Sequence, residues 1–250
     1  MISKNKLKEL SVYKQQKHCK EAGVFVVEGV KMCHEAMAAK TSIRVVCATK
    51  LWLEQHPNLP ANAEVYEVEQ DSLSRLSHMT TPNEVWMLVE RDLPAIPKGQ
   101  PLVLALDRLQ DPGNLGTIIR TADWFGVREI FCAPGTADCF SPKVVQATMS
   151  ALARVNVQYF ASKDEECEWL RKQPGPIYGT FLEGDNIYAT RLQKHAVLVM
   201  GNEGRGVSPE VAALVTDKLL IPHFAADGQH VESLNVSVAT AICLSEMRRN

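Results

Sequence analysis

Three short segments of the sequence combine polar side chains with glycine, and each follows an apolar run of strand length: residues 107–123, 201–210 and 221–237. Amides, a carboxylate and an arginine in such places suit the binding of polar ligands, and glycine lets the backbone approach a ligand closely. In open parallel sheets, ligands bind beyond the carboxyl ends of the strands. We therefore expect the chemistry of this protein at these three segments.

The first segment contains Asn114 and Arg120. Pro112-Gly113 predicts a turn, and Asn114 is suited to cap the helix that follows. Arg120 then lies nearly two turns into that helix, where its planar guanidinium suits a phosphate better than a lysine would. A capped helix with an ordinary surface arginine is the alternative interpretation.

The second segment is the turn Gly201-Asn-Glu-Gly-Arg-Gly206, which precedes a helix start at Ser208-Pro209. Its glycine spacing is neither the dinucleotide fingerprint nor a phosphate-binding loop, so sites for NAD and ATP are disfavoured. Backbone amides of the turn are suited to hold a small polar ligand, and Glu203 is the carboxylate within it. A tight structural turn is the alternative.

The third segment runs from Ile221-Pro222 to a helix that we expect to begin near Ser233. That helix is apolar almost all round, which is typical of a helix buried in a large core or an interface. Ser233 and Asn235 are then polar groups at a buried helix N-terminus and need partners from protein or ligand. Capping alone is the alternative, and the histidines nearby lack a third ligand, so we expect no metal site.

Composition limits the function classes. The chain has 250 residues, a net charge of −2, 46% hydrophobic and 22% charged residues, as expected for a globular protein and not for a disordered one. It has no apolar run of membrane-helix length, and its polar N-terminus predicts no signal peptide, so we expect a cytoplasmic protein. The seven scattered cysteines are expected to be buried and reduced. Nucleic acid would need a local basic patch, and residues 1–40, with eight lysines and four glutamates, carry +4.

Apolar runs alternate with helix-like stretches, which predicts an α/β protein. Residues 1–92 are expected to form a small α/β domain, the proline-rich stretch 93–101 a linker, and residues 102–250 a larger domain with a parallel sheet covered on both faces. The expected strands are 24–27, 43–48, 65–68, 85–89, 102–106, 129–132, 155–160, 177–181, 196–200 and 218–221. The expected helices are 4–20, 30–39, 51–56, 72–79, 115–125, 142–154, 164–172, 209–215 and 233–247.

Together the three segments resemble the motifs of the SpoU family of RNA ribose 2′-O-methyltransferases. The likeness lies in Asn114-Leu-Gly-Thr-Ile-Ile-Arg120, in Gly201-Asn-Glu-Gly-Arg-Gly206, and in Ile221-Pro222 followed by Ser233-Leu-Asn-Val-Ser237. Residues 23–29, Gly-Val-Phe-Val-Val-Glu-Gly, and the basic stretch before them look like the substrate domain of the family. The resemblance thus covers nearly the whole chain.

The resemblance implies a catalytic domain with a C-terminal trefoil knot, a homodimer formed through that domain, and S-adenosylmethionine as cofactor. It implies methyl transfer to a ribose 2′-hydroxyl of structured RNA, most of all ribosomal RNA, with no membrane partner. The catalytic residues it implies are Arg120, Asn114, Glu203, Ser233 and Asn235. The residues it implies for cofactor binding are Gly201, Asn202, Gly206, Ile221 and Leu234.

Several alternatives stay open. A tRNA ribose methyltransferase, an enzyme that methylates a base, a resistance methyltransferase and a non-catalytic RNA-binding protein can share this fold. The proton acceptor is open too, because the resemblance nominates Arg120 although a guanidinium is normally always protonated, which leaves Glu203 as the other candidate. Ten residues, 223–232, separate Pro222 from Ser233, more than is typical of the family, and an outward bulge or a reshaped cofactor pocket are the two alternatives for this segment.

Overall fold

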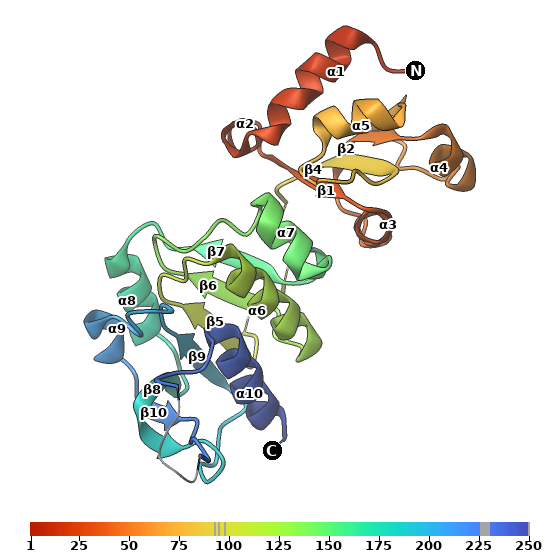
Figure 1. The fold of residues 1–250 in the computed structure, drawn as a ribbon. Coiled ribbons are helices and arrows are strands. Elements are labelled where there is room, and N and C mark those ends of the chain that lie inside the picture. The colour runs from red at the N-terminus through yellow and green to blue at the C-terminus, as the bar shows by residue number, and fades with distance from the viewer. Residues whose placement is uncertain (93, 95, 98, 226–230, 250) are drawn as a thin grey trace. The chain divides into compact units, whose positions relative to one another are not determined.

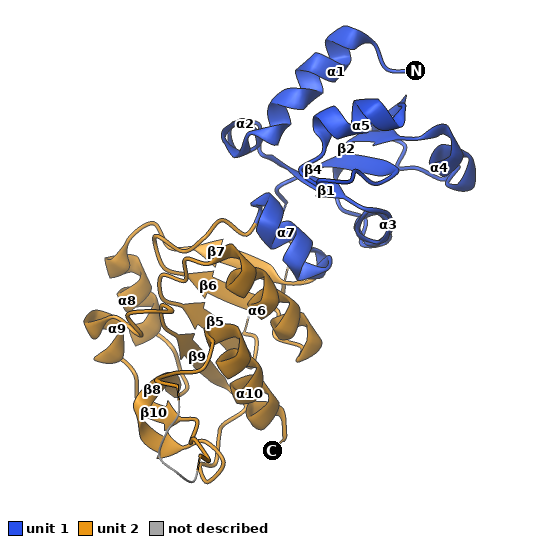
Figure 2. Cartoon of the chain, in the orientation of Figure 1, with its two compact units in different colours: residues 1–93, 140–153 blue, residues 94–139, 154–250 orange. Residues whose placement is uncertain are grey.

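The structure is a computed structural model, and it describes residues 1–92, 94, 96–97, 99–225 and 231–249. The chain forms two compact units, which Figure 2 colours separately. Unit 1 comprises Met1–Leu93 and Phe140–Ala153, and unit 2 comprises Pro94–Cys139 and Arg154–Asn250. Residues 140–153 thus cluster with unit 1, although the sequence places them within the larger domain. The domain boundaries at residues 92 and 102 remain a prediction.

Unit 1 contains a four-stranded sheet of order β1-β4-β2-β3, in which β2 and β3 are parallel and the other pairs antiparallel (Figure 1). Its strands are β1 (Val24–Glu28), β2 (Ile43–Ala48), β3 (Glu64–Glu67) and β4 (Val85–Glu90). Its helices are α1 (Lys4–Ser11), η1 (Val12–Lys14), α2 (Gln16–Glu21), α3 (Val30–Ala38), α4 (Lys50–Gln55), α5 (Gln70–Leu76), α7 (Pro142–Thr148) and η2 (Ala151–Ala153).

Both faces of this sheet are covered, because alternate residues of a strand point to opposite sides. Val24 and Val26 of β1 pack in one cluster with Leu7 and Leu10 of α1. The intervening residue, Phe25, lies in contact with Phe140, with ring centroids 4.9 Å apart. The second face therefore receives residues that follow β6 in the chain, more than a hundred positions after β1.

Unit 2 contains a six-stranded sheet of order β10-β8-β9-β5-β6-β7, and every strand pair in it is parallel. The predicted parallel sheet is confirmed. The strands are β5 (Leu102–Leu106), β6 (Glu129–Cys132), β7 (Asn156–Tyr159), β8 (Ile177–Asn186), β9 (Ala196–Met200) and β10 (Asp217–Leu220). The helices are α6 (Pro112–Trp124), α8 (Lys163–Arg171), α9 (Pro209–Ala212) and α10 (Val236–Arg249).

Helices lie on both faces of this sheet. Leu170 of α8 and Val211 of α9 share one buried cluster with Ala105 of β5. Helices α6 and α10 pack side by side (Figure 1). Burial on both sides explains why the central strands β5 and β9 are continuous apolar runs rather than alternating ones.

Two of the predicted helices are interrupted by a local break in the backbone. Residues 4–20 do not form one helix, because Gln15 is extended (φ −95°, ψ 120°) and separates η1 from α2. The helix expected at 142–154 ends at Thr148, because Met149 and Ser150 take left-handed conformations (φ 47° and 69°) before η2 begins. In both cases the apolar spacing continues past a local backbone break, which periodicity does not register.

All seven cysteines lie in the described part of the chain, are buried and form no disulfide bond there, as the sequence predicts. Burial raises the pKa of the Cys47 thiol to about 12, so this group stays protonated and unreactive near neutral pH. Across the described ranges, no helix combines the length and the apolar character needed to cross a membrane.

Glu28 is a buried carboxylate, 4% exposed, at the end of β1. It accepts hydrogen bonds from the Ser77 hydroxyl and, over 3.0 Å, from the His78 N–H. Burial alone would raise its pKa, but these bonds and the nearby His78 ring outweigh burial and lower the pKa below 4.5. The carboxylate therefore stabilises unit 1 above its usual pKa, and this contribution is lost as the pH falls through the lowered value.

We predict that Glu28→Ala lowers the free energy of unfolding by about 1–3 kcal/mol near neutral pH, because it leaves buried donors without an acceptor. The measurement is hydrogen exchange of β1 and β4 in both proteins. The difference between them should shrink once the pH falls below 4.5. If the difference in unfolding free energy between the two proteins stays constant as the pH falls, Glu28 is not ionised in the folded protein.

Candidate functional site

Two of the three predicted segments begin side by side. Strands β5 and β9 are parallel neighbours, with Leu106 opposite Met200. The N–H of Asp107 donates to the Met200 carbonyl over 2.9 Å, so the loops that follow both strands leave the sheet at the same level. Figure 1 shows these strands in the middle of the sheet, with α6 following β5.

Asp111, and not Asn114, caps α6. The Asp111 Oδ1 accepts from the Asn114 N–H over 2.8 Å, and Pro112 occupies the first helical position. The prediction that Asn114 is the cap is wrong, because the helix begins before Asn114. The Asp-Pro pair could have shown this, since proline is favoured directly after a capping side chain.

Glu203 connects the turn after β9 to the start of α6. Its carboxylate accepts from the N–H groups of Gln110 (3.3 Å) and Asp111 (3.0 Å) and from the Asn114 amide (3.3 Å). These backbone N–H groups precede the helix and have no partner within it. The Glu203 carboxylate is thus held as a hydrogen-bond acceptor for the neighbouring loop.

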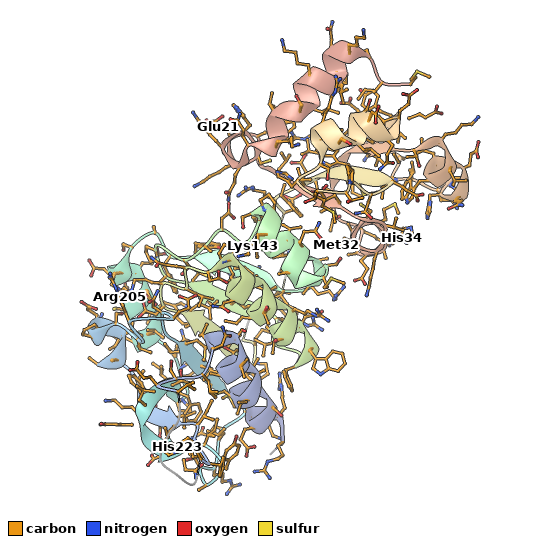
Figure 3. The ribbon with its side chains drawn as sticks, in the orientation of Figure 1. Glu21, Met32, His34, Lys143, Arg205 and His223 are labelled. Atoms are coloured by element: carbon orange, nitrogen blue, oxygen red, sulfur yellow. The ribbon has the colours of Figure 1, made fainter. Side chains whose placement is uncertain are left out.

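Asn202 shapes the turn itself. Its main chain exchanges two 2.9 Å hydrogen bonds with Gly206, and its Oδ1 accepts from the N–H groups of Gly204 and Arg205. Its amide nitrogen donates over 2.7 Å to the carbonyl of Arg108, a residue in the left-handed region with φ 60°. We call residues 201–206 the Gly201 hairpin, and Figure 3 labels Arg205 in it.

Gly201 has no room for a side chain. A Cβ there would lie 2.3 Å from the Gly206 carbonyl carbon and 2.4 Å from the Val207 nitrogen. Gly206 itself has φ 66°, in the region that favours glycine. Both glycines are therefore required by the hairpin geometry.

The third segment joins the other two through Asn235. Its amide nitrogen donates to Asn114 Oδ1 over 2.9 Å, and its Oδ1 accepts from the N–H (2.9 Å) and hydroxyl (2.6 Å) of Ser237. Asn235 therefore caps α10, which begins at Val236 and not near Ser233. We call Glu203, Asn114 and Asn235 the amide relay, because each contacts the next across three separate segments.

The N-terminus of α10 is exposed, which corrects the expectation that it is buried. Ser233 and Asn235 are exposed, and Leu234 is 46% exposed. The helix buries polar groups instead, including Thr240 and Ser237. The Thr240 hydroxyl donates to the Val236 carbonyl over 2.7 Å, and this hydrogen bond allows the polar side chain to be buried.

Arg120 stands apart from the amide relay. It is exposed, and in the described part of the chain its guanidinium forms neither an ion pair nor a hydrogen bond. It lies six positions after Asn114 in the same helix, about 9 Å along the axis. The structure thus brings Asn114, Glu203 and Asn235 together and leaves Arg120 open to a ligand.

Sequence reasoning missed a buried carboxylate, Asp107, whose side chain is fully buried beneath these loops. Its Oδ2 accepts from the Ser208 N–H over 2.6 Å, and its Oδ1 accepts from Lys163 Nζ over 2.8 Å. The available signal was its place directly after β5, since polar residues at that end of a parallel strand face the ligand side of the sheet.

The remaining predicted cofactor residues present apolar surface and free backbone groups. Leu234 is about half exposed and Ile221 partly buried. The N–H groups of Ser233 and Leu234 have no acceptor among the described residues. An apolar side chain beside free backbone donors fits a nucleoside-like ligand better than a metal ion. Residues 226–230, in the long segment before them, lie outside the described residues.

Comparisons with known proteins identify the family of this chain. Residues 101–245 match the SpoU rRNA Methylase family. The chain belongs to this family. Residues 4–86 match the MRM3-like substrate binding domain. The resemblance drawn from the three motifs and from the N-terminal segment is confirmed.

Relatives match over nearly the full length. The chain is 30% identical to an uncharacterized tRNA/rRNA methyltransferase of Synechocystis, over 97% of this chain and 90% of that protein. It is 28% identical to the 23S rRNA (guanosine(2553)-2′-O)-methyltransferase RlmP of Bacillus subtilis, over 97% and 96%.

Solved structures match equally well. A protein of Porphyromonas gingivalis, assigned to the TrmH family of RNA methyltransferases, superposes with a TM-score of 0.89 at 42% identity, over 100% of this chain and 99% of that chain. An rRNA methyltransferase of Sinorhizobium meliloti with bound AdoMet superposes with a TM-score of 0.86 at 29% identity, over 100% and 96%.

The Gly201 hairpin gives a direct prediction. Gly201→Ala should lower the free energy of unfolding by about 1–3 kcal/mol, because the new Cβ overlaps backbone atoms, which cannot move aside as the end of a flexible side chain can. Gly204→Ala is the matched control, since the nearest atom to a Cβ there is 4.0 Å away. Thermal unfolding and hydrogen exchange of residues 201–208 measure both. Equal behaviour of the two variants would refute the packing argument.

Proposed function

We propose that this protein transfers a methyl group from S-adenosylmethionine to a ribose 2′-hydroxyl of ribosomal RNA. The observation that carries the proposal is the amide relay, which joins the three family motifs through side chains at hydrogen-bond distance. An open arginine, Arg120, lies on the same helix as Asn114. The relatives named as 23S rRNA 2′-O-methyltransferases support the substrate class.

Cofactor binding is proposed for Gly201, Asn202, Gly206, Ile221 and Leu234. Gly201 and Gly206 fix the hairpin backbone, and Leu234 offers apolar surface beside free N–H groups. When bound, S-adenosylmethionine supplies an electrophilic methyl group on a sulfonium. The protein then needs neither a metal nor a covalent intermediate, and its main contribution is to hold the two reactants in line.

Arg120 is proposed to bind the phosphate of the target nucleotide and to orient its ribose hydroxyl. A guanidinium stays protonated at neutral pH, so Arg120 contributes charge and geometry more readily than it accepts a proton. Asn114, Glu203 and Asn235 orient the loops around it. Both Glu203 oxygens already accept backbone N–H groups, which favours a role in holding the loop over a role as general base. Ser233 is exposed and is proposed to contact substrate.

Unit 1 is proposed to bind the RNA through its basic N-terminal helices. Lys4, Lys8 and Lys20 are exposed there, and residues 1–40 carry +4. We further propose a homodimer formed through unit 2, a trefoil knot at its C-terminal end, and a cytoplasmic location. The family membership and the exposed apolar residues Trp124 and Val238 support the dimer.

The test is a map of ribose 2′-O-methylation in ribosomal and transfer RNA, compared between the source organism and a strain that lacks the gene. We expect loss of a mark in ribosomal RNA that returns with the wild-type protein. Loss of a tRNA mark would instead establish a tRNA ribose methyltransferase. If no mark changes and the purified protein does not bind S-adenosylmethionine, the proposed function is wrong.

Arg120→Ala should lower kcat for RNA methylation by about a hundredfold or more, because the phosphate and the hydroxyl lose their positioning group. Binding of S-adenosylmethionine should not change. Arg171→Ala, at an exposed position in the last turn of α8, is the control. Methyl transfer to 23S rRNA and calorimetric cofactor binding measure both effects, and near-normal turnover in Arg120→Ala would contradict the assigned role.

RNA affinity should fall steeply with salt, because phosphate contacts release counterions. The double variant Lys8→Gln/Lys20→Gln should weaken RNA binding and flatten the slope of log affinity against log salt by about one or two. Filter binding at several salt concentrations measures this slope. An unchanged slope would place the RNA-binding surface elsewhere.

A further inference from the structure

A buried charge cluster lies beneath the Gly201 hairpin. Lys163, at the start of α8, places its Nζ 2.8 Å from Asp107 Oδ1 and 2.6 Å from Glu166 Oε2. The Asp107 side chain is fully buried and that of Glu166 is 1% exposed, whereas that of Lys163 is 28% exposed. The Lys163 Nζ also lies 3.3 Å from the Ser208 hydroxyl. One ammonium group thus serves two buried carboxylates.

Lys163 makes the shortest cation contacts to both carboxylates of this cluster. Removing one partner of a buried ion pair leaves an uncompensated charge, which is strongly unfavourable. Arg108 is a second cation near Asp107, and its Nε lies 3.2 Å from Oδ1, farther than the Lys163 Nζ at 2.8 Å. Burial would raise the pKa of Asp107, but the bonds from Lys163 and Ser208 outweigh burial and keep the pKa below its usual value. Asp107 is therefore ionised and can accept the Ser208 N–H as a charge-assisted bond.

The Asp107 bond fixes one end of the loop that contains the Gly201 hairpin. Ser208 lies two positions after the last residue of this turn and is the N-cap of α9, and its N–H donates to Asp107. The other constraint is Glu203, which binds the start of α6. The hairpin is therefore held near its tip by its own carboxylate, and at its downstream end by a carboxylate that Lys163 keeps charged and in place.

We propose that Lys163 is a positioning residue for S-adenosylmethionine binding: by holding Asp107, it fixes the Ser208 N–H and so pre-organises the Gly201 hairpin for the cofactor. This inference rests on the proposed function, because it assigns the hairpin to cofactor binding. A pre-organised loop binds more tightly because less ordering remains to be done on binding. The predicted effect is on affinity for the cofactor and not on the chemistry at Arg120.

The experiment measures S-adenosylmethionine binding by calorimetry and methyl transfer to 23S rRNA in the full-length protein. Lys163→Met should raise the Kd and the KM for S-adenosylmethionine about tenfold, the loss expected for one charge-assisted hydrogen bond. The value of kcat at saturating cofactor should change less than twofold, and RNA affinity should not change. Hydrogen exchange of residues 201–208 should speed up, while the core of α8 stays protected.

Three further variants separate positioning from stability. Lys172→Met breaks an exposed ion pair with Glu168 at the C-terminal end of α8 and should leave the Kd unchanged. Glu166→Gln removes the partner of Lys163 that does not contact Ser208, and should shift the unfolding temperature more than the Kd. Lys163→Arg keeps the charge and should restore part of the affinity. If Lys163→Met does not fold, Lys163→Gln, which retains a hydrogen-bond donor, replaces it with a smaller expected rise in Kd.

The outcomes are distinguishable. If the wild-type protein does not bind S-adenosylmethionine, the proposed function fails. If the wild type binds it and folded Lys163→Met binds equally well, the positioning role fails while the proposed function stands. An effect of Lys163→Met on the unfolding temperature alone, with an unchanged Kd, would also overturn the positioning role, because it shows a purely structural cluster.

Discussion

The site depends on two loops that must satisfy each other's backbone groups. Strands β5 and β9 are parallel neighbours that end at the same level, and beyond the bond from the Asp107 N–H to the Met200 carbonyl the backbone groups of the following loops need other partners. In each loop, a carboxylate side chain accepts hydrogen bonds from backbone N–H groups of the other loop. Asp107, after β5, accepts the Ser208 N–H of the β9 loop, and Glu203, in the β9 loop, accepts two N–H groups before α6. Because each loop supplies an acceptor to the other, the two hold one shape together, and the asparagines of the amide relay can be placed on it.

Asparagine suits the positions of the amide relay because its side chain donates and accepts at once. Asn114 donates to Glu203 and accepts from Asn235. A single side-chain amide is therefore hydrogen-bonded to two other segments and fixes their positions relative to α6. Aspartate would lack the donor, and a hydrophobic residue would lack both. The relay lies beyond the carboxyl ends of the central strands β5 and β9, at the N-termini of α6 and α10. Arg120 is left with its whole guanidinium available, as a group that meets a charged substrate requires.

Much of this fold follows from the sequence, because strands such as β5 and β9 are buried on both faces and stand out as continuous apolar runs. All ten predicted strands are present in the described chain. Helix ends are less predictable, since Asp111, Met149 and Asn235 set them through local capping or a left-handed backbone that apolar spacing does not encode. The motifs indicated Asn114, Glu203 and Asn235 but not their mutual contacts. Lys163 was not predicted, because its partners Asp107 and Ser208 are 56 and 45 positions away in the chain.

The grouping of residues 140–153 with unit 1 bears on how the protein can be divided. The chain passes between its two units at residues 93–94, 139–140 and 153–154. Val144 and Val145 of α7 are buried, and Gln146 donates to the Glu28 carbonyl at the end of β1. A truncated chain beginning at residue 94 would retain α7 but lose the strand on which it packs. Such a fragment would present apolar side chains to water and aggregate, so the two units are not interchangeable modules and cannot be exchanged between relatives by a single junction.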